Sequence, residues 1–243
     1  MNVEITGAKI YLRLPFGILI TETQVNMWII MLVIALLCKW LTRDLKIRPS
    51  GKRQVVAEYL VSMANKFVVT NMGKSFKSFA PFIGALFSLS LLCSLSGLFG
   101  LYPPTADLST TLGWATVTFV LIMYFKLKMN GLKGYLKGLT EPIFVLAPFN
   151  VIGEFSTPIS MAIRMFGNIS TGVVISTLVY AALAWLSSVV LQWLPGALSG
   201  IPILQLGLPA ILSIYFDLFS GVLQSFIFCM LTVLYIAQEA KES

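Results

Sequence analysis

The stretch 150-NVIGEFSTPISMAIRMFGNISTG-172 lies in the longest apolar region of the chain, yet it carries four strongly polar residues, Asn150, Glu154, Arg164 and Asn168. A charged side chain at the centre of a membrane helix costs roughly 2.5–3.5 kcal/mol on insertion scales. Such a side chain usually faces a partner or a water-filled cavity, and it is a candidate functional residue. We therefore interpret the rest of the chain as the surroundings of Arg164.

The composition is that of a membrane protein. The 243 residues are 57% hydrophobic and only 11% charged, which is outside the range of soluble domains. A crossing needs about 20 apolar residues, which leaves room for about five membrane helices and an amphipathic surface helix. We expect an all-α polytopic membrane protein, a single membrane domain over 1–243, whose last two helices form a long and steeply tilted hairpin.

Residue types that serve metal binding and catalysis are absent or scattered. Histidine is missing, and Cys38, Cys93 and Cys229 lie in apolar runs without metal-ligand spacing. We interpret the cysteines as small buried hydrophobic residues and expect no metal site. There is no GxxxxGK[ST] phosphate-binding loop, so we expect no cofactor and no nucleotide site. The net charge is +7. Because the distribution of the basic residues along the chain fits orientation in a membrane, we expect no nucleic-acid partner.

The first third of the chain predicts an orientation in the membrane. Residues 1–24 are mixed, and 25–41 is apolar enough for a first helix. The segment 42–78 is basic, and within it 55–72 predicts a helix lying on the membrane surface. Together with Lys39 it holds nine of the 17 Lys and Arg residues. The positive-inside rule makes this segment cytoplasmic and the N-terminus external.

The segment 79–125 predicts a helical hairpin. Its outward arm, 79–102, ends at 103-PPTADLSTT-111, a turn without basic residues, as expected outside the membrane. The return arm, 113–125, leads into 126–142, which carries four lysines and is again expected in the cytoplasm.

The segment 143–236 predicts two long helices. A helix from Glu154 to Trp193 would be about 60 Å long, twice the roughly 30 Å of the hydrocarbon layer, so it must tilt or break. Proline and glycine residues between 195 and 202 indicate the turn. The run 203–236 is also too long for an upright crossing, and the polar C-terminus is expected inside.

Polar residues recur at helical spacing on both long helices. Arg164, Asn168 and Thr171 share a face with Met161, since they are three or four residues apart. A second face on the last helix contains Ser213, Asp217, Ser220, Gly221, Gln224 and Phe228.

Two carboxylates are displaced from the arginine along the helix axes. Glu154 precedes Arg164 by about 15 Å of helix, and Asp217 precedes Gln224 by about 10 Å. If Arg164 and Gln224 are level, one carboxylate lies on each side of the arginine. An intramembrane cation between two displaced carboxylates indicates an interrupted ion path.

Plainer interpretations stay open for each of these residues. Arg164 and Asp217 could form a buried structural ion pair. Asn168 and Gln224 could supply only hydrogen bonds between helices. Glu154 could be a helix-start residue near the interface, and serines such as Ser220 are often small packing residues.

Two motifs carry a resemblance that covers most of the chain. The segments 158-PISMAIRMFGNIS-170 and 223-LQSFIFCMLTVLYIAQE-239 closely resemble subunit a of the F-type ATP synthase membrane sector. The basic segment after the first helix, the proline loop 103–105 and the total length also fit. The resemblance implies that Arg164 faces the rotating c-ring and blocks leakage between two half-channels.

The same resemblance implies further roles and partners. Asn168 and Gln224 take the polar positions beside the arginine, and Ser220 and Thr171 are candidates for the ion path. The implied partners are the c-ring, subunit b of the peripheral stalk, other membrane-sector subunits and the lipid bilayer. The implied location is a bacterial cell membrane, with the N-terminus outside and the C-terminus in the cytoplasm.

One position departs from the family pattern. Many members carry a carboxylate nine residues after the arginine, where this chain has Val173, and some have histidine where it has Asp217. The outer half-channel is therefore expected to depend on Asp217. The implied function is a stator that carries H⁺ or Na⁺ to and from the ring carboxylates and has no nucleotide site of its own. The alternatives are a secondary ion transporter, which should show inverted repeats, and a non-conducting scaffold.

Overall fold

The computed structural model describes residues 8–13, 15–17, 19–43, 45–47, 51–140, 144–191 and 214–241. Its α-helices are α1 (Glu22–Leu41), α2 (Lys52–Met72), α3 (Ala80–Leu95), α4 (Leu108–Thr140), α5 (Ala147–Leu191) and α7 (Gly221–Lys241). Short 3₁₀ turns are η1 (Pro15–Gly17), η2 (Lys74–Phe79), η3 (Ser96–Phe99), η4 (Pro104–Ala106) and η5 (Phe144–Leu146), and η8 (Ile214–Ser220) is a π-helix. Strands β1 (Ile10–Arg13) and β2 (Leu19–Thr21) form a small antiparallel hairpin.

The prediction of an all-α polytopic membrane protein is confirmed. Within the described ranges, five helical stretches are long and apolar enough to cross a membrane: Glu22–Leu41, Lys74–Phe99, Leu108–Thr140, Phe144–Ser187 and Leu218–Glu239. The first two stretches are separated by α2, and the second and third by the proline-containing turn η4.

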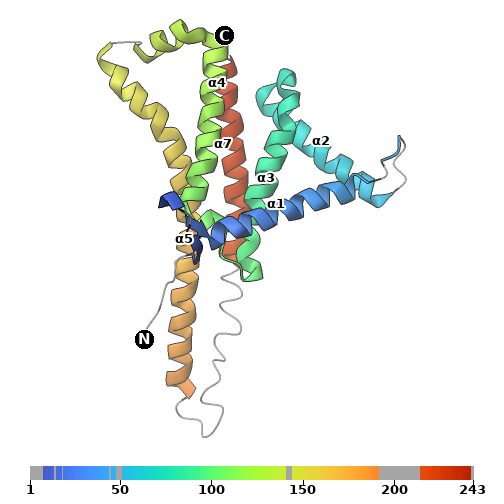
Figure 1. The fold of residues 1–243 in the computed structure, drawn as a ribbon, viewed down its shortest axis with the longest axis vertical. Coiled ribbons are helices and arrows are strands. Elements are labelled where there is room, and N and C mark those ends of the chain that lie inside the picture. The colour runs from blue at the N-terminus through green and yellow to red at the C-terminus, as the bar shows by residue number, and fades with distance from the viewer. Residues whose placement is uncertain are drawn as a thin grey trace.

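Helix α7 lies at the centre of the helix bundle (Figure 1). Its apolar window is 44% buried, against 11–28% for the other four stretches. Val233 and Ile236 of α7 pack against Val68 of α2 and Ile83 of α3. A Cβ atom added at Gly221 would lie 3.2 Å from the Cβ atom of Ser94 on α3, so a small residue allows this close approach.

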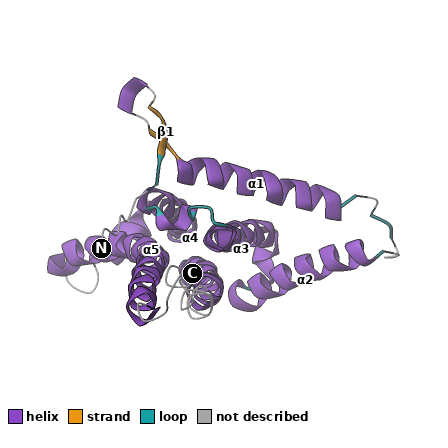
Figure 2. Ribbon diagram, turned by 90° about the horizontal axis from the view of Figure 1, so that it is seen from below, coloured by secondary structure: helices purple, strands orange, loops and turns teal. Residues whose placement is uncertain are grey.

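Helix α1 leaves the bundle and runs crosswise to the later part of α5, which Figure 2 shows nearly end-on. Its first turns are held by hydrogen bonds, and near its other end the Arg53 guanidinium of α2 lies 4.4 Å from the centre of the Trp40 ring. Asn26 donates from Nδ2 to the Tyr102 carbonyl over 3.0 Å, and Thr23 donates from Oγ1 to Asp107 over 2.7 Å. Asp107 also accepts from the Ser109 backbone N–H at 2.9 Å and so caps the start of α4. One carboxylate thereby connects two helices.

Helix α4 is longer than the sequence predicts. The return arm expected to end at 125 continues as helix to Thr140, through residues expected to form a polar cytoplasmic stretch. The helix is kinked at Gly131, where φ is 64° and ψ is 169°, a conformation that glycine adopts without steric cost. Its lysine-bearing end therefore projects as helix beyond the apolar part.

Helix α5 contains the arginine stretch and is the longest element. Its 45 residues span about 68 Å, more than twice the thickness of the hydrocarbon layer. Pro158 lies inside the helix and cannot donate to the carbonyl of Glu154. The helix changes direction along its course in Figure 1. The expected turn at 195–202 lies outside the described residues.

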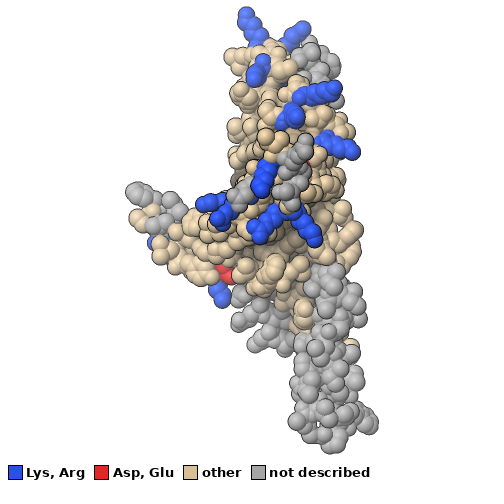
Figure 3. Space-filling model, turned by 90° about the vertical axis from the view of Figure 1, so that its right-hand side faces the viewer, with Lys and Arg blue, Asp and Glu red and all other residues tan. Residues whose placement is uncertain are grey.

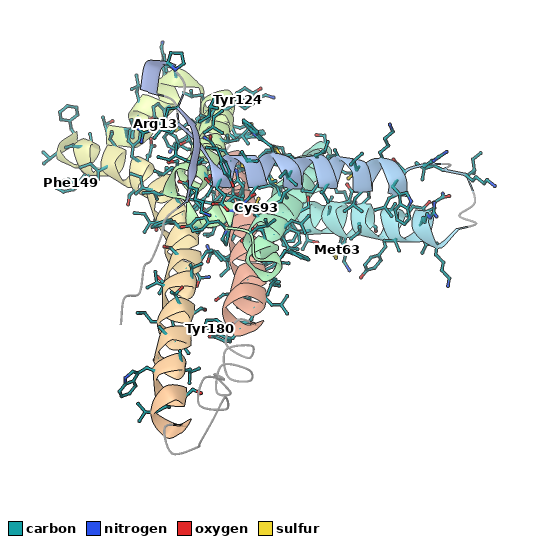
Figure 4. The ribbon with its side chains drawn as sticks, turned by 60° about the horizontal axis from the view of Figure 1, so that its bottom comes forward. Arg13, Met63, Cys93, Tyr124, Phe149 and Tyr180 are labelled. Carbon is teal, nitrogen blue, oxygen red and sulfur yellow. The ribbon has the colours of Figure 1, made fainter. Side chains whose placement is uncertain are left out.

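The two ends of α5 lie on different sides of the bundle (Figure 4). Phe149, in its first turn, lies far from Tyr180, which is on the part of α5 that extends past the bundle. Cys93, fully buried on α3, lies inside the bundle between them. The stretch around Arg164 thus lies between the two projecting ends of α5.

Candidate functional site

Arg164 lies on an exposed side of α5. The methionines at neighbouring positions face the other way: Met161 and Met165 are 2% and 0% exposed and pack against Phe228 of α7. Within the part of the chain that the structure describes, no carboxylate lies within ion-pair distance of Arg164. An exposed guanidinium on an apolar membrane helix is costly in lipid, so such a side chain usually faces a charged partner or a water-filled cavity.

Helices α5 and α7 run antiparallel at the level of the arginine. Asn168 and Ser220 contact each other through two long hydrogen bonds: Asn168 Nδ2 donates to the Ser220 carbonyl at 3.5 Å, and Ser220 Oγ donates to Asn168 Oδ1 at 3.4 Å. Four residues before Asn168 is Arg164, and four residues after Ser220 is Gln224. Because the two chain segments run in opposite directions, four residues back from Asn168 and four residues on from Ser220 lead the same way along the helix axes. Arg164 and Gln224 therefore lie at similar heights along these axes.

Arg164 and Gln224 nevertheless differ in exposure. Gln224 is 5% exposed and lies inside the bundle, whereas Arg164 and Thr171 are exposed and Asn168 is half-buried between them. The residues expected to share one polar face of α5 therefore differ in exposure. Met161 is buried, Asn168 is half-buried, and Arg164 and Thr171 are exposed. Among the described residues of this face, Asn168 hydrogen-bonds to Ser220 at the end of η8, and the alternative that Asn168 and Gln224 serve only as interhelical hydrogen-bonding groups stays open.

Asp217 lies three residues before Ser220 within the π-helix Ile214–Ser220. The wider π-helical turn interrupts the regular spacing of α-helix side chains, and such turns are frequent at functional sites. The side chain of Asp217 lies outside what the structure describes. Its pairing with Arg164, one of the open alternatives, is therefore left as a prediction.

Glu154 is held by partners from this chain. Its Oε1 accepts from Lys126 Nζ of α4 at 2.8 Å, and its Oε2 accepts from the Tyr135 hydroxyl at 2.8 Å. Lys126 Nζ also lies 3.4 Å from Glu239 Oε1 on α7. The side chains of Lys126, Glu154 and Glu239 are 20%, 17% and 20% exposed. We call Lys126, Tyr135, Glu154 and Glu239 the lysine cluster.

The lysine cluster contains three residues that sequence analysis did not identify. The sequence places Lys126 and Tyr135 in the lysine-bearing stretch 126–142 and Glu239 near the polar C-terminus, without pairing them with Glu154. Their partners are 28 residues away for Lys126 and 19 residues away for Tyr135, beyond any helical periodicity. The one available signal was a lysine at the end of an apolar run, which also fits a snorkelling side chain.

One oxygen of the lysine cluster has no hydrogen-bond partner within the described residues. This atom, Glu239 Oε2, is buried, and an unpaired buried carboxylate oxygen is unfavourable unless a cation or water reaches it. The described residues contain no group of three His, Cys, Asp or Glu that could hold a metal ion.

Basic side chains concentrate on particular surfaces. Figure 3 shows Lys and Arg over much of the upper part of one face, with little acidic surface among them.

At the external turn predicted from the sequence, burial and then the Asp107 and Glu22 carboxylates raise the pKa of Tyr102. The Tyr102 phenol therefore stays neutral at physiological pH.

Comparison with known proteins identifies similar chains. A family model described as ATP synthase A chain matches residues 24–237. A Propionigenium modestum protein named ATP synthase subunit a, sodium ion specific, is 33% identical over 237 residues, covering 91% of this chain and 74% of the relative. ATP synthase subunit a of Moorella thermoacetica is 32% identical, covering 90% of each chain. ATP synthase subunit a 2 of a Bradyrhizobium strain is 30% identical over 89% of this chain and 87% of its own.

Proposed function

Because the chain belongs to the ATP synthase A chain family, we propose that Arg164 is the fixed charge that separates the two halves of its ion path. The chain is a multi-pass membrane protein of an ATP synthase membrane sector, where it serves as the ion-channel stator. A secondary transporter is not favoured, since the family match extends over nearly the whole chain.

The observation that carries this proposal is the position of Arg164. It is exposed on an apolar helix, and no described carboxylate of its own chain neutralises it. A rotating ring of subunits with ion-carrying carboxylates would supply the missing negative charge one subunit at a time. The proposed partners are therefore the c-ring on the Arg164 side, and subunit b, other membrane-sector subunits and lipid elsewhere.

The proposed mechanism is electrostatic. The guanidinium stays protonated at any physiological pH. A ring carboxylate within about 4–6 Å of it is held in the charged form, and a charged carboxylate elsewhere would be costly in lipid. Each carboxylate therefore gives up its ion on approaching Arg164 and takes up another before re-entering lipid. Because a carboxylate binds either H⁺ or Na⁺, this account holds for both ions.

The two half-channels are assigned by position along the helices. Asp217 is the ionisable group of the outer half-channel, and Glu154 belongs to the inner one. With Arg164 and Gln224 at similar heights along the helix axes, Glu154 and Asp217 are displaced from the arginine in opposite directions along those axes. Asn168 and Ser220 fix the spacing of the two helices between them, while Gln224 and Thr171 add polar groups beside the arginine.

The proposed orientation places the N-terminus outside and the C-terminus in the cytoplasm of a bacterial cell, as the charge distribution predicts. Lys52, Ser109 and Lys133 are exposed and therefore suitable for labelling. Cysteines at Lys52 and Lys133 should react with an impermeant reagent from the cytoplasm only, and one at Ser109 from outside only. Labelling of Lys52→Cys and Ser109→Cys from the same side would refute the orientation.

The function is tested at Arg164 in assembled complexes reconstituted into vesicles. Arg164→Ala should abolish ion-driven ATP synthesis and open a passive ion leak. Arg164→Lys keeps the charge but loses the planar donor fork, and it should lose synthesis with a smaller leak. Ile163→Ala truncates an exposed neighbour on the same helix and should keep near wild-type synthesis. Wild-type synthesis by assembled Arg164→Ala complexes would refute the proposal.

A further inference from the structure

The lysine cluster joins three helices at some distance from Arg164. We propose that Lys126 is a positioning residue of the ion path, which leaves one net negative charge on the cluster so that it binds and releases one cation at a time. This proposal rests on the proposed function, because it places the cluster in the inner half-channel.

The geometry puts Lys126 between two carboxylates from different helices. Its ammonium lies 2.8 Å from Glu154 on α5 and 3.4 Å from Glu239 on α7. An ammonium is a compact charge with three donors on a flexible stem, so it can remain bound to either carboxylate while favouring one. The Tyr135 hydroxyl occupies the second oxygen of Glu154 at 2.8 Å, which makes Glu154 the better satisfied of the two.

Counting charges shows what the cluster can bind. Two carboxylates and one ammonium give a net charge of −1, with the tyrosine neutral. Glu154 has partners for both oxygens, whereas Glu239 Oε2 is buried without a partner among the described residues. An arriving cation would therefore bind at Glu239 Oε2, where it would satisfy the buried oxygen and bring the cluster to neutrality.

Lys126 sets how tightly that cation is held. Without the ammonium, two partly buried carboxylates would repel each other and bind a cation strongly, which would slow its release. Without Glu239, the remaining Lys126–Glu154 pair would be neutral and would not attract a cation. The wild-type cluster, with a net charge of −1, lies between these two cases. It attracts a cation but also releases it, as rapid passage of ions through the path requires.

A set of charge variants distinguishes this role from simple helix packing. Lys126→Gln should lower the maximal rate of ion-driven ATP synthesis about tenfold and lower the ion concentration for half-maximal rate. Glu239→Gln should raise that half-maximal concentration. The double variant, Lys126→Gln with Glu239→Gln, restores the net charge of −1 and should recover most of the rate, although it removes two contacts.

The matched control is Lys128→Gln. It makes the same charge change two residues away on α4, where Lys128 is exposed beside the Tyr124 ring rather than in the cluster. Its synthesis rate should stay close to that of the wild type. Lys126→Arg keeps the charge and should retain much of the rate.

The outcomes separate the two proposals. These variants are compared in complexes whose wild type couples ion flow to ATP synthesis. If the double variant made ATP more slowly than Lys126→Gln, Lys126 would serve only to hold helices together, and this inference would be overturned. Loss of the proposed function would instead appear as wild-type synthesis by Arg164→Ala, whatever the cluster variants do.

Discussion

Two charged residues of α5, ten positions apart, have opposite surroundings. Glu154 contacts Lys126 and Tyr135 of α4, each at 2.8 Å, and shares Lys126 with Glu239 of α7. Arg164 is exposed, with no ion-pair partner in the described part of the chain. One helix therefore carries a carboxylate whose two oxygens both have partners in this chain and, ten residues later, an exposed guanidinium without an ion-pair partner among the described residues.

The contrast separates a paired charge from an unpaired one. Partly buried charges cost free energy unless they are paired and hydrogen-bonded, and both oxygens of Glu154 have such partners within the folded chain. A charge balanced by a moving partner must stay unpaired inside its own chain, since an internal carboxylate would compete with the ring. The neighbouring Met161 and Met165 hold the helix by apolar packing instead.

The largest expected effect comes from giving Arg164 an internal partner. Asn168→Asp places a carboxylate four residues after the arginine, within reach on the helix surface. ATP synthesis should fall at least about tenfold because the new carboxylate competes for the guanidinium. Asn168→Ala removes the same contact to Ser220 without adding charge and should lose much less. Equal losses in the two variants would mean that the arginine does not depend on an external carboxylate.

A smaller loss is expected at Asp217. Asp217→Asn keeps the size of the side chain but removes the ionisable group assigned to the outer half-channel. Ion-driven synthesis should slow several-fold while assembly, followed by co-purification of the ring, is unchanged. An assembled complex with the wild-type rate would remove Asp217 from the ion path.

Removing one hydrogen bond at the balanced end of α5 should have a modest effect. Tyr135→Phe frees Glu154 Oε2 and leaves the Lys126 contact in place, so about a twofold change in synthesis rate is expected. Tyr124→Phe, on the same helix but outside the lysine cluster, is the control. A tenfold loss in Tyr135→Phe would show that the phenol itself takes part in ion transfer.

The smallest expected effect concerns the contact between α5 and the end of η8. Ser220→Ala removes the hydroxyl that donates to Asn168 at 3.4 Å, and membrane side-chain hydrogen bonds average about 0.6 kcal/mol. The free energy of unfolding in detergent should fall by no more than about that amount. A loss of several kcal/mol would mean that this long contact is central to the helix pair.

Sequence alone predicted the features that depend on local pattern. Apolar runs indicated the five spans. The 3–4 spacing grouped Met161 with Arg164, Asn168 and Thr171, whereas the structure buries Met161 and exposes Arg164 and Thr171. The kink at Gly131 could not be located from the sequence, because Gly134 and Gly138 lie in the same stretch and offer the same conformational freedom. The exposure of Arg164 could not be read from spacing either, since it depends on which side of α5 meets α7.

The lysine cluster shows why long-range pairing escapes a sequence. Lys126 and Glu154 are 28 residues apart, and Glu239 lies on another helix altogether. A lysine that ends an apolar run has the same sequence pattern whether it reaches water or a buried carboxylate. Only the antiparallel packing of α4, α5 and α7 decides between these outcomes.

The central claim is that the partner of Arg164 belongs to another subunit, and cross-linking tests it most directly. Thr171 is exposed on the arginine side of α5, whereas Ile169, two residues earlier, is 5% exposed. Cysteines are introduced at each position separately, and one is placed beside the ion-binding carboxylate of the ring subunit. Cys38 is exposed, whereas the sequence suggested that all three cysteines are buried, so Cys38 is replaced by serine. The account predicts an oxidative cross-link from Thr171→Cys to the ring and none from Ile169→Cys. A cross-link from Ile169→Cys alone, in assembled complexes, would contradict it.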